Sequence, residues 1–272
     1  MQNDWLSAFA YSLAHPDALP QGINDFACRS DTRPVVLVNG TVENSYANWS
    51  RLAPQLAADG HCVYGFDYGG AAGSPIQQVG PMRASGLQLA AFIDRVRTAT
   101  GSAKVDLIGH SQGGLLPLYY LNVLGGAGKV GRMIGIEPAS QGVSLYGAFL
   151  LPKLIPGGTA LEGIVCAACV DFTESSSFIR EVAAGGYTRP GVEYTTIISR
   201  TDGVIRLSEA RLPAAPNVTN IITQDVCGLD FTDHVNAVYD DITLRIARNA
   251  LNPAKSVPPV CKPVWPLLPP QR

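Results

Sequence analysis

Residues 105–114 read Val-Asp-Leu-Ile-Gly-His-Ser-Gln-Gly-Gly, an apolar run that leads directly into a serine flanked by glycines. The next residues, 115–120, read Leu-Leu-Pro-Leu-Tyr-Tyr and are compatible with a helix. A serine on such a tight strand-to-helix turn projects its hydroxyl away from the sheet, and Gly109 and Gly113 keep side chains out of the crowded backbone. The stretch therefore predicts a nucleophile elbow with Ser111 as the nucleophile.

A glycine-rich turn with an incidental serine is the alternative interpretation, because Gly-x-Ser-x-Gly is a short pattern and the chain contains 28 glycines. That alternative makes no demand on the flanking residues. An apolar strand before the motif and a helix after it are the context that a nucleophile elbow requires. The surroundings of Ser111 therefore favour the elbow.

Short apolar runs alternate with longer helical patterns on both sides of the elbow. Helices with apolar residues at three- and four-residue spacing are expected at 47–58, 87–99 and 235–251. Strands rich in Val, Ile or Thr are expected at 35–38, 62–67, 104–108, 132–137, 193–199 and 218–223. The alternation predicts an α/β fold with a mostly parallel central sheet flanked by helices.

Two segments depart from this alternation within what we expect to be a single domain over 1–272. Residues 139–192 are too apolar for a solvated linker and too rich in Gly and Pro for one long helix. Such an insertion predicts a cap or lid over the site, with a rigid packed subdomain as the alternative. Residues 252–272 are rich in proline and are expected to form neither helix nor central strand.

Length and composition exclude several classes of protein. At 272 residues and 46% hydrophobic content, the chain can bury a large core. A formal net charge of −2 with 15% charged residues provides no basic stripe, so we expect no nucleic-acid partner. No apolar run approaches the ~20 residues that cross a bilayer, and the first residues do not resemble a targeting signal.

The chain has six cysteines, and none neighbours a histidine at metal-ligand spacing, so we expect no metal site. Six cysteines allow fifteen full pairings, which sequence alone does not separate. The hypothesis that we favour is the set Cys28–Cys62, Cys166–Cys169 and Cys227–Cys261.

The third of these disulfides would tether the proline-rich tail. Cys166-Ala-Ala-Cys169 is alternatively a redox motif, but it lies in a loop-like stretch and does not open a helix after a strand, which favours a structural clip. A set of disulfides predicts an oxidising, extracytoplasmic location.

A serine hydroxyl needs a base to take its proton, and histidine has a suitable pKa. Of the four histidines, His15 lies in a loop-like N-terminal segment, His61 precedes a strand beyond a crossover, and His110 adjoins the nucleophile but points elsewhere. His234 follows the last predicted strand at the mouth of the final helix, as the chain order Ser, acid, His requires. A surface histidine near a helix start is the alternative interpretation.

The acid that orients the imidazole must lie between Ser111 and His234, on a loop after a strand. Asp202 fits best, because it follows the strand expected at 193–199 in the sequence Arg-Thr-Asp-Gly. Asp-Gly is also a common turn pair, so a turn role alone would explain it. The competing acids are Asp171, Glu174 and Asp225.

The tetrahedral intermediate of acyl transfer also needs donors for its oxyanion. One is expected to be the backbone N–H of Gln112, directly after the nucleophile. The other is expected from the loop Asn39-Gly40-Thr41 after the first central strand. We assign it to the N–H of Thr41, whose hydroxyl is a candidate third donor, and an ordinary turn is the alternative for this loop.

Several ordered motifs together resemble the secreted class 2 triacylglycerol lipases of actinobacteria, an α/β-hydrolase family. These motifs are residues 35–41, Asn48-Trp49, residues 109–114 and the surroundings of Asp202 and His234. The resemblance spans about residues 25–250 and implies an extracellular, cofactor-free hydrolase of lipid-type carboxylic esters. By position, it implies that Ser111, Asp202 and His234 are nucleophile, acid and base. It likewise implies that Thr41 and Gln112 supply the oxyanion amides.

The chain departs from that family where His-Gly usually precedes the oxyanion loop, because Asn39-Gly40 stands there. The resemblance therefore leaves the support of this loop open. The motifs predict a secreted, monomeric serine ester hydrolase that forms an acyl-enzyme with a hydrophobic ester. Acyl transfer to an alcohol or hydrolysis of a polyester with the same triad are alternatives. A non-catalytic binding protein on the same fold is a third, but it predicts a missing triad member.

Overall fold

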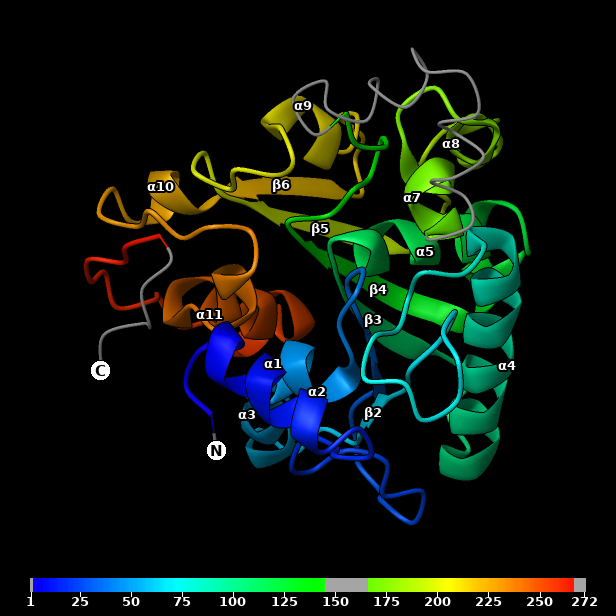
Figure 1. Cartoon of the computed structure of the whole chain (residues 1–272), viewed down its shortest axis with the longest axis horizontal. Coiled ribbons are helices and arrows are strands. Elements are labelled where there is room, and N and C mark those ends of the chain that lie inside the picture. The colour runs from blue at the N-terminus through cyan, green and yellow to red at the C-terminus, as the bar shows by residue number, and fades with distance from the viewer. Residues whose placement is uncertain (1, 145–165, 267–272) are drawn as a thin grey trace.

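Six parallel strands form one sheet in the residues that the computed structural model describes, 2–144 and 166–266 (Figure 1). The strand order is β2-β1-β3-β4-β5-β6, and each neighbouring pair is parallel. The strands are β1 (Val35–Val38), β2 (Val63–Gly65), β3 (Val105–His110), β4 (Val130–Ile136), β5 (Glu193–Ile198) and β6 (Val218–Ile222). The predicted α/β class with a mostly parallel sheet is confirmed.

Helices cover both faces of this sheet and bury two separate apolar cores. Successive side chains of a strand point to opposite faces, so Val36 of β1 lies in one core and Leu37 in the other. The helices on the first face are α4 (Met82–Thr100) and α5 (Gln112–Asn122). Those on the second face are α2 (Ser45–Trp49), α3 (Leu52–Ala58) and α11 (Asp241–Leu251) (Figure 1).

Short helices fill several of the connections. They are α7 (Ala167–Phe172), α8 (Ser177–Ala183), α9 (Leu207–Ala210), α10 (Thr223–Val226), and the 3-10 turns η1 (Gly126–Lys129), η3 (Asn236–Val238) and η4 (Pro253–Lys255). The predicted proline-rich tail thus contains one 3-10 turn, which tolerates Pro253 because proline at the first helical position loses no helical hydrogen bond. Val264 pairs with Asp230 farther along this tail.

Two of the predicted helices are interrupted. The helix expected over 47–58 is divided into α2 and α3, because Pro54 has no N–H to continue a helical bond to Ser50 and its ring would clash with that carbonyl. The helix expected over 235–251 consists of η3 and α11, where Asp240 starts a new helix by accepting the N–H groups of Ile242 and Thr243. The helix expected over 87–99 is α4, which begins five residues earlier, at Met82.

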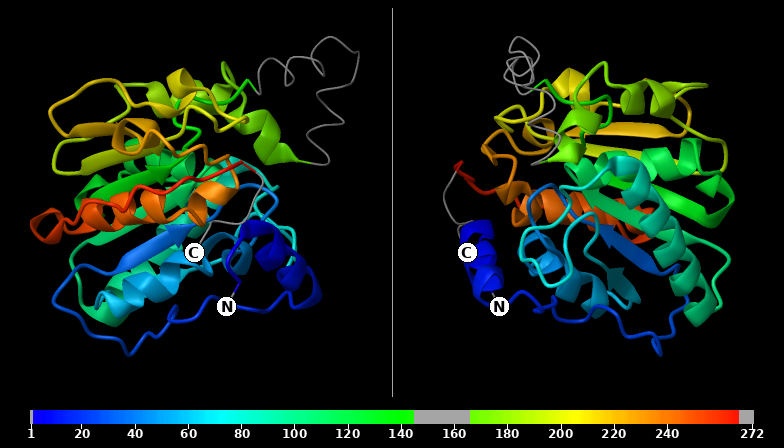
Figure 2. Two further views of the ribbon diagram at one scale, coloured as in Figure 1. Left: turned by 90° about the vertical axis from the view of Figure 1, so that its left-hand side faces the viewer. Right: turned by 45° about the vertical axis from the view of Figure 1, so that its right-hand side comes forward.

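An N-terminal helix, α1 (Trp5–Ala14), replaces the loop that the sequence suggested around His15. Asp4 caps it by accepting the N–H of Ser7 at 2.8 Å. The helix packs on α2 at the periphery of the molecule (Figures 1 and 2). The sequence analysis missed this helix, and the capping residue Asp4 is the local signal that could have indicated its start.

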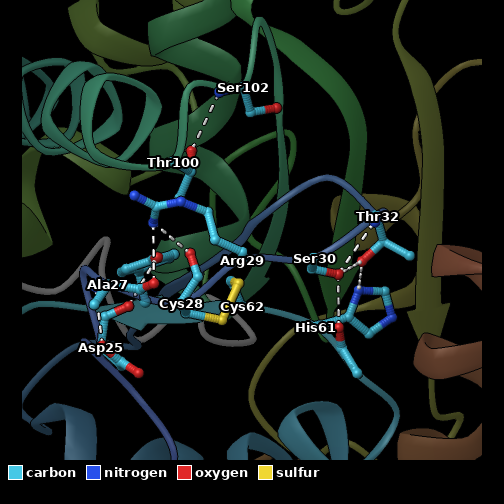
Figure 3. Close-up of a disulfide and its surroundings, with 12 residues drawn as sticks. Asp25, Ala27, Cys28, Arg29, Ser30, Thr32, His61, Cys62, Thr100 and Ser102 are labelled. Carbon is cyan, nitrogen blue, oxygen red and sulfur yellow. Dashed lines mark hydrogen bonds between the residues drawn. A yellow bond between two sulfur atoms is a disulfide. The ribbon is translucent and has the colours of Figure 1, made fainter.

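Three disulfides join Cys28 to Cys62, Cys166 to Cys169 and Cys227 to Cys261, which is the favoured pairing. The first fastens the segment before β1 to the start of β2, and beside it Ser30 donates a hydrogen bond to the carbonyl of Gly60 (Figure 3). The expectation that Cys166-Ala-Ala-Cys169 lies in a loop is wrong. Cys166 is the N-cap of α7, and its Sγ accepts the N–H of Cys169.

The insertion expected over 139–192 lies partly outside the described residues, which omit 145–165. Its described parts contain α7, α8 and an isolated bridge between Val143 and Thr173. Among residues 2–144 and 166–266, no helix combines the length and the apolar character that crossing a membrane requires.

Candidate active site

Ser111 occupies a strained turn between the end of β3 and the start of α5. Its φ of 54° and ψ of −121° lie in a region that non-glycine residues rarely adopt. A Cβ on Gly109 would lie 1.8 Å from the carbonyl oxygen of Gly113, and a Cβ on Gly113 would lie 2.0 Å from that of Val38. The two glycines are therefore required by close backbone approach, as the motif predicted.

The structure brings Ser111, His234 and Asp202 into one hydrogen-bonded line. The Nε2 of His234 lies 2.9 Å from the Oγ of Ser111, and its Nδ1 lies 2.6 Å from the Oδ2 of Asp202. Both His234 and Asp202 are buried. A carboxylate at Oδ2 makes Nδ1 the donor, which leaves Nε2 free to accept the serine proton.

Asp202 is held as a carboxylate by the donors around it. Its Oδ1 accepts the N–H groups of Val204 at 2.6 Å and Ile205 at 2.5 Å. Burial raises the pKa of Asp202, but the charge and hydrogen bond of His234, together with the Ile205 amide and the Glu137 side chain, outweigh burial, so its pKa is below the ordinary value. Asp202 therefore stays ionised at neutral pH, as an orienting acid must.

The three competing acids form no hydrogen bond to His234 in the described residues, and the carboxyl groups of two of them bond to other groups. Asp225 is exposed and pairs with Arg200 at 2.7 Å. Asp171 accepts the N–H of Met82 at the start of α4. Glu174 follows Thr173, and its backbone N–H pairs with Val143. Of these four candidate acids, Asp202 is the one with a hydrogen bond to His234.

His110 lies closer to the chemistry than the sequence suggested. Its ring is buried with its centroid 5.0 Å from that of His234, and its Nε2 lies 2.9 Å from the backbone oxygen of His234. That contact requires a proton on Nε2, so Nδ1 is the acceptor for the Nδ2 of Asn48 at 3.0 Å. The other two histidines lie away from the site: His15 stacks on Tyr11, and His61 contacts Thr32 (Figure 3).

Asn48 extends this line to the loop expected to hold the oxyanion. Its Oδ1 accepts the N–H of Gly40 at 2.8 Å while its Nδ2 faces His110. The side chain is fully buried, so both contacts are shielded from water. Asn48 therefore joins the Gly40 loop to the residue next to Ser111, a role that the sequence did not reveal.

Thr41 and Gln112 meet at the mouth of the elbow. The hydroxyl of Thr41 donates to the Oε1 of Gln112 at 2.6 Å, so it is engaged by that side chain and does not stand as a free third donor. Within the described residues, the backbone N–H groups of Thr41 and Gln112 have no acceptor. Two unused amides beside a serine hydroxyl can stabilise a developing oxyanion.

Asn39, which stands where the resembled family usually has histidine, holds the loop of Gly40 and Thr41 through its side-chain hydrogen bonds. Its Nδ2 donates to the Oδ1 of Asp67 at 2.8 Å and to the carbonyl of Phe66 at 3.1 Å. Its Oδ1 accepts the indole N–H of Trp49 at 2.7 Å. The asparagine is thus fully bonded in a buried position and fixes the backbone that precedes Gly40.

An apolar cavity of about 300 Å³ lies over Ser111. Its wall comes from segments far apart in the sequence and includes Trp5 of α1, a residue that the sequence did not single out. The apolar side chains of this wall are Trp5, Val42, Ala139, Val143, Phe172, Val204, Ile205 and Val235. In the part of the chain that is described, no three His, Cys, Asp or Glu side chains gather as metal ligands.

Comparison with known proteins agrees with this architecture. A family model for the alpha/beta hydrolase fold matches residues 33–155. Lipase B of Aspergillus fumigatus superposes with a TM-score of 0.67 at 19% identity, over 89% of this chain and 56% of that one. The mature lipase BlEst2 of Bacillus licheniformis gives 0.59 at 17% identity, over 86% and 96%. The protein has the alpha/beta hydrolase fold.

Curated relatives of this alpha/beta-hydrolase-fold chain are similar over about half of its length. A triacylglycerol lipase of Pseudarthrobacter phenanthrenivorans is 38% identical over 143 residues, which are 51% of this chain and 42% of that protein. A triacylglycerol lipase of Burkholderia plantarii has the same identity over 51% and 38%. The matched segment thus spans about two fifths of each relative.

Proposed function

We propose that the protein is a serine-dependent carboxylic ester hydrolase. The observation that carries the proposal is the line Ser111–His234–Asp202, with contacts of 2.9 and 2.6 Å, at the mouth of an apolar cavity. Serine is a weak nucleophile unless a positioned base takes its proton, and this arrangement supplies both base and orienting acid.

In the proposed reaction, His234 takes the proton of Ser111 as its Oγ attacks the ester carbonyl carbon. The carbonyl oxygen becomes an oxyanion that accepts the backbone N–H groups of Thr41 and Gln112. His234 then gives the proton to the leaving alcohol as the ester C–O bond breaks, which leaves an acyl-enzyme. Water, deprotonated by His234, attacks that ester and releases the carboxylic acid and Ser111.

The substrate that we propose is a triacylglycerol or another hydrophobic ester. The wall of the cavity is mainly apolar, which favours an acyl group over a charged one. The names of the two curated relatives, both triacylglycerol lipases, support the same class of substrate. Three disulfides support an extracellular setting, because such bonds persist in oxidising compartments. We propose that the enzyme acts as a monomer.

The test is hydrolysis of p-nitrophenyl esters from acetate to palmitate by the wild type and by Ser111→Ala. We expect the wild type to hydrolyse these esters. The kcat of Ser111→Ala should be lower by at least about 10⁴-fold, since Ala cannot form the acyl-enzyme. Ser140→Ala is the matched control, because this buried serine has no hydrogen-bond partner in the described part of the chain and should retain activity. Hydrolysis that survives in Ser111→Ala would contradict the proposal, and no hydrolysis by the wild type would favour a binding protein.

A further inference from the structure

We propose that Glu137 is a neutral carboxylic acid that donates a hydrogen bond to Asp202, and so serves as a positioning residue behind the triad. The inference rests on the proposed function, because it assigns to Glu137 a role in holding the acid that orients His234. Glu137 does not touch the cavity over Ser111.

The backbone places Glu137 directly beneath the nucleophile. It follows the last residue of β4 and has a φ of 43°, a left-handed conformation that is costly for a glutamate. On its N-terminal side, Ile136 accepts the N–H of Ser111 at 3.0 Å, and on its C-terminal side Ala139 donates to the carbonyl of Ser111 at 3.1 Å. This turn directs the Glu137 side chain into the interior, where it is completely buried.

The hydrogen bonds around the two carboxyl groups determine which of them carries a proton. Asp202 accepts three N–H donors, from Val204, Ile205 and His234. Glu137 accepts one, from the N–H of Ser199 to its Oε1 at 2.7 Å. Its Oε2 is buried, and within the described residues no N–H or hydroxyl donor reaches it.

Glu137 nevertheless reaches the segment that carries Asp202, because its Oε1 accepts the N–H of Ser199, three residues before Asp202. The unpaired carboxyl oxygen of Glu137 is thereby brought close enough to the Asp202 side chain for the two groups to interact. Two carboxylates are both acceptors, so the contact is a hydrogen bond only if one of them is protonated. Asp202 accepts three donors and Glu137 accepts one, so the negative charge is more stable on Asp202. The proton therefore belongs on the Oε2 of Glu137, which turns an unpaired buried atom into a donor.

The charges around Glu137 favour the same assignment. The titratable groups that face it are Asp202, from the loop after β5, and Asp230, from the loop after α10, and both are acids. Within the described residues, Glu137 forms no ion pair with a lysine, arginine or histidine. Complete burial, followed by the charge of Asp202, raises the pKa of Glu137 well above its ordinary value.

A neutral Glu137 leaves Asp202 as the negative charge that contacts Nδ1 of His234. The donated hydrogen bond fixes the carboxylate plane of Asp202, so that Oδ2 stays directed at Nδ1 of His234. A neutral neighbour adds no second charge beside this ion pair. A charged Glu137 would add a second negative charge near the imidazole and move the acid limb of activity to higher pH.

The first experiment compares the pH dependence of kcat/KM for the wild type, Glu137→Gln and Glu137→Leu on one p-nitrophenyl ester. Glutamine matches the protonated acid, since its NH₂ donates to Asp202 and its oxygen accepts from Ser199. We expect the acid limb of Glu137→Gln to stay within about 0.2 pH unit of the wild type. Glu137→Leu should lose on the order of tenfold in kcat/KM, because Asp202 loses its donor.

An acid limb of Glu137→Gln that falls by about one pH unit would overturn the proposal, because such a fall is the effect of removing a real negative charge near the imidazole. Equal activity of the wild type and Glu137→Leu would overturn the positioning role.

Infrared difference spectroscopy tests the protonation state without any turnover. At pH 7, the wild type should show the C=O stretch of a buried carboxylic acid that Glu137→Gln lacks. Glu209→Gln is the matched control, because Glu209 is also buried but accepts donors on both oxygens, from Ser144 and from Arg206. A band that persists in Glu137→Gln would refute the neutral acid. The band remains informative if the wild type hydrolyses no ester, so failure of the proposed function is distinguishable from failure of this proposal.

Discussion

At the scale of single residues, Asn48 joins two parts of the site that the chain places far apart. It lies eight residues after Gly40 and 62 residues before His110, and its carboxamide bonds to both. His110 in turn contacts the backbone oxygen of His234, a further 124 residues along. The position of the His234 backbone, next to the proposed catalytic imidazole, and that of the proposed oxyanion loop are therefore coupled through Asn48 and His110.

Asn48→Ala should lower kcat while leaving KM nearly unchanged. The substitution removes the acceptor of the Gly40 N–H, and an unsatisfied buried donor costs about 1–3 kcal/mol. The loop beside Thr41 then loses its fixed position, for which we expect on the order of a tenfold loss in kcat, less than loss of a direct oxyanion donor. Steady-state kinetics on p-nitrophenyl butyrate measures this.

Asn44→Ala is the control for Asn48→Ala. Asn44 is equally buried and caps α2, and its Nδ2 donates to Ser12 and Pro75, but it does not contact the Gly40 loop. Both variants should lower Tm, and we expect kcat to fall in Asn48→Ala alone. A parallel loss of kcat in the two variants would show that Asn48 acts through general stability.

Sequence reveals some of these residues and hides others for a physical reason. Ser111 lies in a motif whose backbone crowding demands local glycines, and His234 and Asp202 follow from the order of strands and turns. The motif Asn48-Trp49 marks Asn48 but not its role, and Glu137 carries no local signature, because the partners of both side chains come from separate strands and loops. Their roles are set by tertiary structure, which single-residue patterns do not encode.

At the scale of elements, strands are predicted more accurately than helix interruptions. The strands are buried on both faces, so β1 and β3 read as apolar runs that end within two residues of the expected bounds. Apolar spacing continues through the break between α2 and α3, where Pro54 and not hydrophobicity decides the boundary. The same reasoning missed α1, whose first turn is set by the cap at Asp4.

Helix α1 contributes Trp5 to the cavity wall, so we expect this helix to influence substrate choice. The indole N–H of Trp5 donates to the Oε1 of Glu43 at 2.7 Å, which orients the ring beside the site. Trp5→Ala should open the wall of the cavity. The ratio of kcat/KM for a branched acyl ester to kcat/KM for the acetate ester should then rise by about fivefold, the size of effect that a methylene group has in an apolar pocket.

Leu6→Ala is the control for the Trp5 variant, because Leu6 is the next residue of α1 but is 70% exposed. Competition between a branched and a linear p-nitrophenyl ester measures the ratio of kcat/KM directly. The ratio should stay at the wild-type value in Leu6→Ala. An unchanged ratio in Trp5→Ala would show that the acyl group does not lie against α1.

At the scale of the whole molecule, the disulfides divide into two kinds. Cys28–Cys62 and Cys227–Cys261 each join residues 34 apart in sequence and fasten peripheral segments to the body of the fold. Cys166–Cys169 spans three residues, and Cys169 lies in the wall of the cavity. The stability that a disulfide provides through the unfolded chain grows with the loop that it closes.

Replacing each pair with alanines should therefore separate stability from activity. Loss of either long-range disulfide should lower the free energy of unfolding by about 4 kcal/mol, and loss of Cys166–Cys169 by about 1.5 kcal/mol, on the chain-entropy estimate. Only the loss of Cys166–Cys169 alters the cavity wall, so this variant alone should raise KM for hydrophobic esters. Urea unfolding and ester kinetics on the three double variants measure both effects. If the Cys166–Cys169 variant lost the most stability, or if KM rose equally in all three, then loop length would not set stability and Cys169 would have no special place in the site.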